Sequence, residues 1–231
     1  MNLESQIYKE CKALEKDEKS KAWSKNLYNT KKDVFGLYTK EINDIIKKYK
    51  NENFENLNNR NTYELNLIYI KIKLNQIKNL AKQADFLKNN LDIIDTWAIT
   101  DTTYQLLNIK NFAEALILHE EFISIDNEML NRYAYLIFFK FKEQELCFKE
   151  MLSRFKSSKY YYVNMAEAWV IATLYIFFPT ETYKFLETSD ISNEIKLKSI
   201  SKICDSFRID QEEKEKVKKL RIKIHEKEKL Q

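Results

Sequence analysis

The chain is almost without the two residues that shape turns. Its 231 residues include one glycine, Gly36, and one proline, Pro179. Average usage would give roughly 16 glycines and 11 prolines in this length. Hairpins need residues that tolerate a positive φ, above all glycine, so the composition argues against a sheet protein. We therefore predict an all-α fold with short connections, in which asparagine and aspartate cap the helices.

Apolar residues recur at helical spacing along the whole chain, and no low-complexity linker divides it. We therefore expect a single α-helical domain over residues 1–231. The predicted helices span residues 3–14, 17–28, 38–50, 61–74, 76–88, 92–107, 112–124, 127–141, 143–156, 159–177, 180–187, 193–207 and 211–229. Connections this short make successive helices antiparallel neighbours, in either a globular bundle or a solenoid of helical pairs.

Some helix ends carry local signals. Asp126 and Ser192 stand before predicted helices and are residue types that favour the N-cap position. Pro179 follows a predicted helix and is suited to open the next one. Residues 160–178 are apolar for almost their whole length, but Asn164 and Glu167 interrupt them. We predict a helix buried in a packed stack rather than a membrane span.

Charge and cysteine usage narrow the class of protein. Lys and Arg number 39 against 35 Asp and Glu, a net charge of +4 that permits nucleic-acid binding without requiring it. The three cysteines, Cys11, Cys147 and Cys204, lie too far apart for a metal finger or a disulfide framework. The first ten residues lack the apolar core of a signal peptide. We expect a cytoplasmic protein with reduced thiols.

Several catalytic motifs are absent from the sequence. A single glycine excludes the GxGxxG, P-loop and GxSxG patterns. His119 precedes two glutamates, but no second histidine follows at the spacing of a zinc protease. We expect neither a metal nor another cofactor.

The pair Trp97 and Asp101 is the most informative candidate site. The two residues are four apart in the predicted helix 92–107, which puts an aromatic ring and a carboxylate on one helical face. A carboxylate beside an indole suits a cation, or a centre that becomes cationic. The alternatives are a tryptophan packed in the core and an aspartate that caps or pairs locally.

Four segments together resemble the AlkD family of DNA alkylation-repair glycosylases, which are built from HEAT-like helical repeats. They are Thr96-Trp97-Ala98-Ile99-Thr100-Asp101, Leu130-Asn131-Arg132-Tyr133-Ala134, the run SSKYYYVNMAEAWVIATLYIFFPTETYKFL at 157–186, and KSISKICDSFR at 198–208. A further likeness at 28–40 includes Gly36, although the proline that follows this glycine in the family is missing here. The resemblance implies a HEAT-like solenoid of about a dozen antiparallel helices with a concave DNA-binding face.

The resemblance also implies roles for individual residues. Trp97 and Trp169 would be aromatic walls, and Asp101 the catalytic carboxylate. Arg132 would hold the DNA backbone, and Tyr28 would lie near the lesion. For Trp169, simple core packing stays open. For Arg132, the open alternatives are a surface charge and a local ion pair with Glu128. Candidate phosphate contacts, chosen for their charge alone, are Lys156 and Lys159, together with Lys25, Lys31, Lys32 and Arg154.

The function that the resemblance implies is a monomeric, metal-free glycosylase that releases cationic alkylated purines from double-stranded DNA. Met165 and Thr173 stand where some family members have lysine and arginine, which removes two positive charges from the helix expected to face DNA. Two alternatives stay open. One is a non-catalytic module that binds branched or distorted DNA, and the other is a scaffold that binds a protein.

Overall fold

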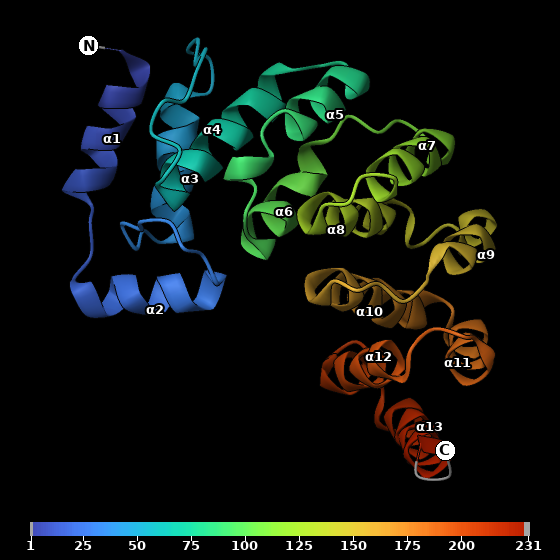
Figure 1. The fold of residues 1–231 in the computed structure, drawn as a ribbon. Coiled ribbons are helices and arrows are strands. Elements are labelled where there is room, and N and C mark those ends of the chain that lie inside the picture. Colours follow the sequence, from blue (N-terminus) through green and yellow to red (C-terminus); the bar gives the residue numbers. More distant parts are fainter. Residues whose placement is uncertain (1, 229–231) are drawn as a thin grey trace. The chain divides into compact units, whose positions relative to one another are not determined.

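The computed structural model describes residues 2–228, and these residues are mainly helical (Figure 1). They form 13 α-helices and three short 3-10 helices, with no strand beyond one isolated bridge between Asp33 and Thr62. The all-α prediction is confirmed. Within the described range, no helix combines the length and apolarity needed to cross a membrane.

The chain divides into two compact units, Met1–Lys110 (unit 1) and Asn111–Gln231 (unit 2). The elements of unit 1 are α1 (Leu3–Ala13), α2 (Glu18–Tyr28), α3 (Thr39–Tyr49), α4 (Tyr63–Gln76), α5 (Leu80–Lys88), η1 (Leu91–Ile93), α6 (Trp97–Thr103) and η2 (Tyr104–Leu106). Those of unit 2 are α7 (Phe112–Ile123), α8 (Glu128–Leu136), η3 (Ile137–Phe141), α9 (Glu145–Arg154), α10 (Tyr161–Phe177), α11 (Pro179–Thr188), α12 (Asn193–Asp205) and α13 (Gln211–Glu228). That the whole chain is one repeat domain stays a prediction.

Helix α4 is the centre of unit 1. Its residues from Tyr63 to Ile70 are all buried, on every side of the helix, and α1, α3 and α6 pack on it. A helix that is enclosed on all sides has no polar face to present to water, so its polar side chains must find partners within the protein. Glu64 does this by accepting hydrogen bonds from three backbone N–H groups in the connection between α2 and α3.

The sole glycine lies in that connection. Gly36 has a φ of 76°, a conformation that side-chain-bearing residues adopt only at a cost. This turn directs the N–H groups of Phe35, Gly36 and Leu37 at the carboxylate of Glu64, at 3.0, 2.8 and 3.2 Å. The glycine is therefore kept where the backbone of a connection wraps around a buried acid.

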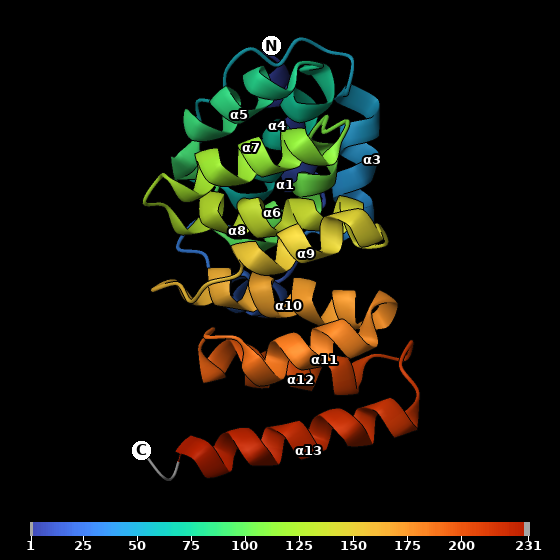
Figure 2. The ribbon, with the colours of Figure 1, turned by 90° about the vertical axis from the view of Figure 1, so that its right-hand side faces the viewer.

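Helix α10 is the centre of unit 2. It packs between α8 and α12, and α13 follows as the next layer beyond α12 (Figure 2). Ten of its residues, among them Asn164 and Glu167, are buried, which confirms the predicted inner helix. Pro179 opens α11 at its first position, and Ser192 caps α12, as predicted.

Asparagine and aspartate side chains cap many of the helices. Asn2, Asp17, Asn79 and Asn111 each accept a hydrogen bond from the first turn of a helix. Asn29 ends α2 in the left-handed conformation, a place that glycine often takes. The prediction that these residues replace glycine is confirmed.

The predicted N-cap at Asp126 is wrong by one residue. Asn127 caps α8, because its side-chain oxygen accepts the N–H groups of Met129 and Leu130, both at 3.0 Å. Asp126 instead pairs with Lys159 at 2.6 Å and accepts the hydroxyl of Tyr160 at 2.8 Å. Two adjacent residues were both good caps, and tertiary partners for one of them decided the register.

Two long predicted helices are broken. Residues 92–107 form a 3-10 turn, a connection, the short helix α6 and a second 3-10 turn. Residues 127–141 form α8, whose continuation tightens into η3. Most other predicted ends differ from the observed ones by one to four residues, and residue 229 of the predicted helix 211–229 lies outside the described residues.

We predict that Asn127→Ala lowers the free energy of unfolding by about 1 kcal/mol, because it leaves N–H groups of the first turn of α8 unbonded. Urea unfolding followed by circular dichroism measures this loss. Asp126→Ala is the matched control, because it removes an exposed ion pair and an exposed hydrogen bond with Tyr160 but no helix cap, and its effect should be smaller. An equal or larger loss in the control would contradict the assignment of the cap.

Candidate functional site

The segment before α6 determines where Trp97 and Asp101 lie. Asp92 accepts two hydrogen bonds from the guanidinium of Arg60, at 2.5 and 2.6 Å. The ammonium of Lys32 donates to the carbonyl oxygen of Asp92 at 2.7 Å, and the hydroxyl of Thr30 donates to Asp95 at 2.7 Å. These bonds hold residues 92–95 outside the helix, so α6 begins at Trp97 rather than at 92.

The carboxylate of Asp101 lies in the second turn of this short helix. Thr96 caps α6 with a bond from the N–H of Ala98 to its hydroxyl oxygen, at 3.2 Å. The hydroxyl of Thr100 donates to the carbonyl of Trp97 at 2.8 Å and lies 3.2 Å from Oδ1 of Asp101. Trp97 and Asp101 are both half-buried, so the acid is not sealed inside the core.

Tyr28 ends α2 in the same unit. Its ring stacks on that of Tyr63 at the start of α4, with centroids 4.4 Å apart and planes 22° from parallel. One face of Tyr28 is thus covered, while the residue as a whole remains half-exposed. Burial raises the pKa of its hydroxyl, so the phenol stays neutral near neutral pH.

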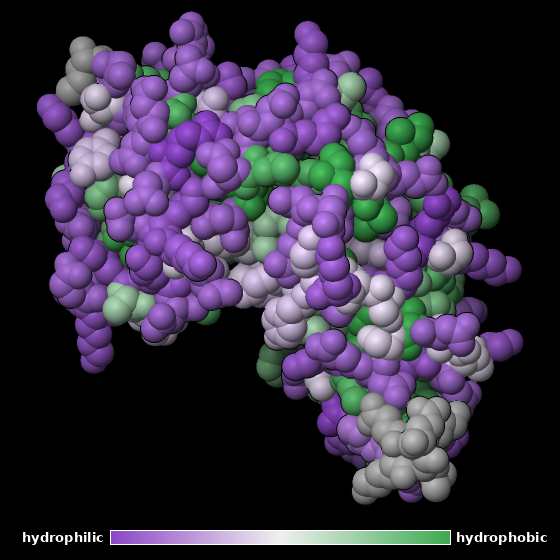
Figure 3. Space-filling view, in the orientation of Figure 1, coloured by the Kyte–Doolittle hydropathy of each residue, from purple (hydrophilic) through white to green (hydrophobic). Residues whose placement is uncertain are grey.

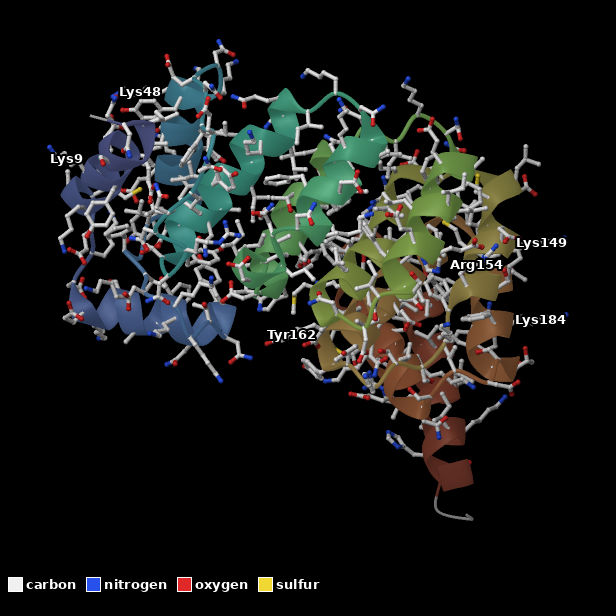
Figure 4. All side chains as sticks on the ribbon, turned by 45° about the horizontal axis from the view of Figure 1, so that its top comes forward. Lys9, Lys48, Lys149, Arg154, Tyr162 and Lys184 are labelled. Atoms are coloured by element: carbon white, nitrogen blue, oxygen red, sulfur yellow. The ribbon has the colours of Figure 1, made fainter. Side chains whose placement is uncertain are left out.

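Arg132 is buried in the structure, with 4% of its surface exposed. Its Nη1 donates to the carbonyl oxygen of Tyr162, which is labelled in Figure 4. The N–H of the same Tyr162 donates to Glu128 at 2.8 Å. Arg132 and Glu128 therefore both bind the backbone at the first turn of α10. The predicted DNA contact of Arg132 stays a prediction.

Trp169 is one of two exposed aromatic residues of the otherwise buried helix α10, the other being Tyr161 at its start. Its ring meets that of Phe139 edge to face, with centroids 4.7 Å apart, while about a third of the residue (36%) stays exposed. The open alternative of simple core packing thus describes only part of its surface. Trp169 and Arg132 lie in unit 2, on helices α10 and α8 that pack together. Trp97, Asp101 and Tyr28 lie in unit 1.

The candidate phosphate contacts differ in how free their charges are. Lys156 is exposed, whereas the exposed Lys159 pairs with Asp126 at 2.6 Å, and this contact raises the pKa of the lysine. Arg154, also labelled in Figure 4, pairs with Glu120 and Glu150, each at 2.6 Å. Lys32 donates to the backbone carbonyl oxygens of Arg60 and Asp92, at 2.6 and 2.7 Å. Lys25 is half-buried and Lys31 is exposed.

The sequence analysis missed the role of a buried acid in unit 2. Glu167 of α10 is fully buried and accepts the backbone N–H of Lys156 at 3.1 Å. Burial raises the pKa of its carboxyl to about 8, opposed by that N–H and by a hydrogen bond with Tyr135. An acid inside an apolar helix was visible in the sequence, but its partners were not.

The described residues hold no group of three or more His, Cys, Asp or Glu side chains arranged to bind a metal ion.

Comparison with known proteins identifies the protein family. A family model described as DNA alkylation repair enzyme matches residues 7–204. Together with the all-helical fold, this match defines a helical DNA-repair protein. The chain belongs to the DNA alkylation repair enzyme family, of the AlkD-like type, and its packed helices are consistent with the HEAT-like fold of that family. Family membership implies a DNA substrate. No curated protein matches the chain significantly.

We predict that Glu167→Gln becomes the more stable protein as pH rises. In the folded protein the carboxyl of Glu167 stays neutral up to about pH 8. In the unfolded chain the same carboxyl ionises near its ordinary pKa of 4.5. Stability from this group is therefore full below pH 4.5 and is lost between pH 4.5 and about 8.

Thermal unfolding measures this effect. Relative to wild type, the melting temperature of Glu167→Gln should rise by about 5 °C or more between about pH 5 and pH 8.5. Glu181→Gln, at an exposed position of α11, is the control and should show no such trend. A pH-independent difference for Glu167→Gln would contradict the assignment.

Proposed function

We propose that this protein is a DNA glycosylase that releases cationic alkylated purines, such as 3-methyladenine and 7-methylguanine, by hydrolysing the N-glycosidic bond. Two facts support the proposal: the family match over residues 7–204, and a half-buried acid four residues from a half-buried indole on α6. The accessibility of Asp101 carries most weight, because a sealed carboxylate has no route to a ligand.

The chemistry of the substrate explains why a site with a single carboxylate can be sufficient. Alkylation at adenine N3 or guanine N7 puts a positive charge on the base, so the base leaves without being protonated. Bond breaking then builds positive charge on the deoxyribose, and water must add to it. An enzyme for this reaction needs a fixed negative charge and a group that orients water, which one carboxylate supplies.

Asp101 is proposed to take this role. At about 4 Å and an effective dielectric near 20, a carboxylate attracts a unit positive charge by about 4 kcal/mol. That stabilisation corresponds to a rate increase on the order of a thousandfold. The attraction is stronger for the developing sugar cation than for the neutral sugar of the ground state, as catalysis requires.

Trp97 is proposed to contact the reacting nucleotide with its indole, and the same role for Trp169 is what the family resemblance implies. A cationic base or sugar over the face of Trp97 or Trp169 gains about 1–2 kcal/mol where water is excluded. Exposed lysines such as Lys156 would contact phosphates, and the enzyme would act on duplex DNA as a monomer. In this scheme Arg132 reaches the DNA only if its bond to Tyr162 exchanges for a phosphate.

We predict that Asp101→Asn slows base release by about a thousandfold, because it removes the charge while keeping the size of the side chain. Chromatography of bases freed from methylated genomic DNA measures the rate. Asp44→Asn is the matched control, since it removes an exposed carboxylate of α3 in the same unit, and it should match wild type.

The outcome against this proposal is equally concrete. A well-folded wild-type protein that binds branched duplexes but frees no methylated purine would favour the non-catalytic module. A protein that binds no DNA at low salt would favour the protein-binding scaffold.

We also predict that Trp97→Ala reduces base release by about tenfold, by removing a cation–π contact with the reacting nucleotide. Single-turnover rates at saturating protein separate this loss from weaker DNA binding. Trp97→Phe should retain part of the rate, because a smaller aromatic face remains. Equal rates for Trp97→Ala and wild type would assign Trp97 to packing.

A further inference from the structure

A groove beside α2 contains none of the groups of α6, α8 and α10 proposed to act above, although Tyr28, which the family resemblance relates to the lesion, lines it. It lies within unit 1, has a volume of about 620 Å³, and is lined by Trp23, Leu27 and Tyr28 from α2 and by Leu37 and Tyr38 from the connection that follows. We call it the α2 groove. Its volume falls within the range of small-ligand sites, about 300–1,000 Å³.

The side chains of the α2 groove are exposed although they are large and apolar. Trp23 is 64% exposed, Tyr38 65% and Leu27 43%. Hydrophilic side chains cover most of the surface of unit 1 on the face shown in Figure 3. Two exposed aromatic rings that line one cavity contrast with that polar surface, and such clusters commonly mark interaction sites.

The charges at the groove favour an anionic partner. Lys19 lines it and has no ion-pair partner among the residues that the structure describes. Lys16 lies over the ring of Tyr38, 4.7 Å from its centroid. Two nearby acids already have hydrogen-bond partners. Asp17 caps α2 by accepting a hydrogen bond from the N–H of Ser20 at 2.9 Å, and Glu41 accepts one from the ammonium group of Lys16 at 2.5 Å.

Flat rings beside the ammonium group of Lys19 suit one ligand in particular. Every nucleobase has a π face that stacks on an aromatic side chain, and its phosphate suits an ammonium group. An apolar protein segment would use the rings but would leave Lys19 unmatched. The one carboxylate that lines the groove, that of Asp17, caps α2, so we do not assign hydrolysis of the N-glycosidic bond to this groove.

We propose that the α2 groove binds an unpaired nucleobase of DNA, stacked against Trp23 and Tyr38, with its phosphate near Lys19. This inference rests on the proposed action on DNA, but not on glycosylase activity. It makes the protein a reader of local disruption in the duplex, at a place distinct from the acid of α6.

The test compares three fluorescently labelled duplexes of one sequence: fully paired, with a one-nucleotide bulge, and with an abasic nucleotide as the bulge. Fluorescence anisotropy gives the affinity of the full-length protein for each, without any methylated base. We expect Trp23→Ala to lose about tenfold in affinity for the base-containing bulge and less than about twofold for the other two duplexes.

Two further variants separate stacking from other effects. Trp23→Phe keeps an aromatic face and should keep most of the preference for the bulged base. Phe207→Ala removes a fully exposed ring of unit 2 and should leave all three affinities unchanged. Circular dichroism checks the fold, which an exposed position such as Trp23 should not disturb.

The inference is overturned if Trp23→Ala lowers the affinity for all three duplexes equally, or if it changes none of the three affinities. It is also overturned if the wild-type protein binds no DNA. A change in sedimentation instead of DNA affinity would assign the groove to a second copy of the chain. If Trp23→Ala selectively loses affinity for the base-containing bulge but the wild-type protein releases no base, the proposed role of the groove stands and the glycosylase proposal fails. If the wild-type protein releases bases but Trp23→Ala shows no selective loss, the glycosylase proposal stands and the role of the groove fails.

Discussion

Both units depend on buried side chains that hydrogen-bond the backbone of the connecting segments. A connection that is neither helix nor strand leaves N–H and C=O groups unpaired, and burying them without partners costs stability. Glu64 of α4 binds three such N–H groups, Glu167 of α10 binds one, and Gln83 of α5 binds one, that of Asn108. With one glycine and one proline available, the chain stabilises these connections by side-chain contacts, and the connection at Glu64 also uses the positive φ of Gly36.

The same device positions the candidate site. Arg60, Lys32 and Thr30 hold the segment ahead of α6, so the helix starts where its first residue is Trp97 and its fifth is Asp101. In unit 2, Arg132 binds the start of α10 in an equivalent way. A residue that the family resemblance relates to DNA thus also has a structural task, and its substitution would disturb the position of α10.

Sequence reasoning went furthest where the signal is local. The helical spacing, the i, i+4 pair Trp97 and Asp101, the apolar run of α10 and the cap at Ser192 all depend on neighbours along the chain. It was less accurate where distant residues compete for the same segment. The predicted helix 92–107 is broken because Asp92 and Asp95 bond with residues far away in the sequence.

The amino-acid sequence by itself determined that the protein is all helical, that its inner helix in unit 2 is enclosed, and that it belongs to a DNA-repair family. Only the tertiary structure decided that Arg132 is buried, that Asp101 is half-buried rather than sealed in the core, and that Trp23 and Tyr38 share an open groove. The reason is physical. Helix formation is governed by propensity and spacing within a few turns, whereas exposure is set by packing between elements distant in the sequence.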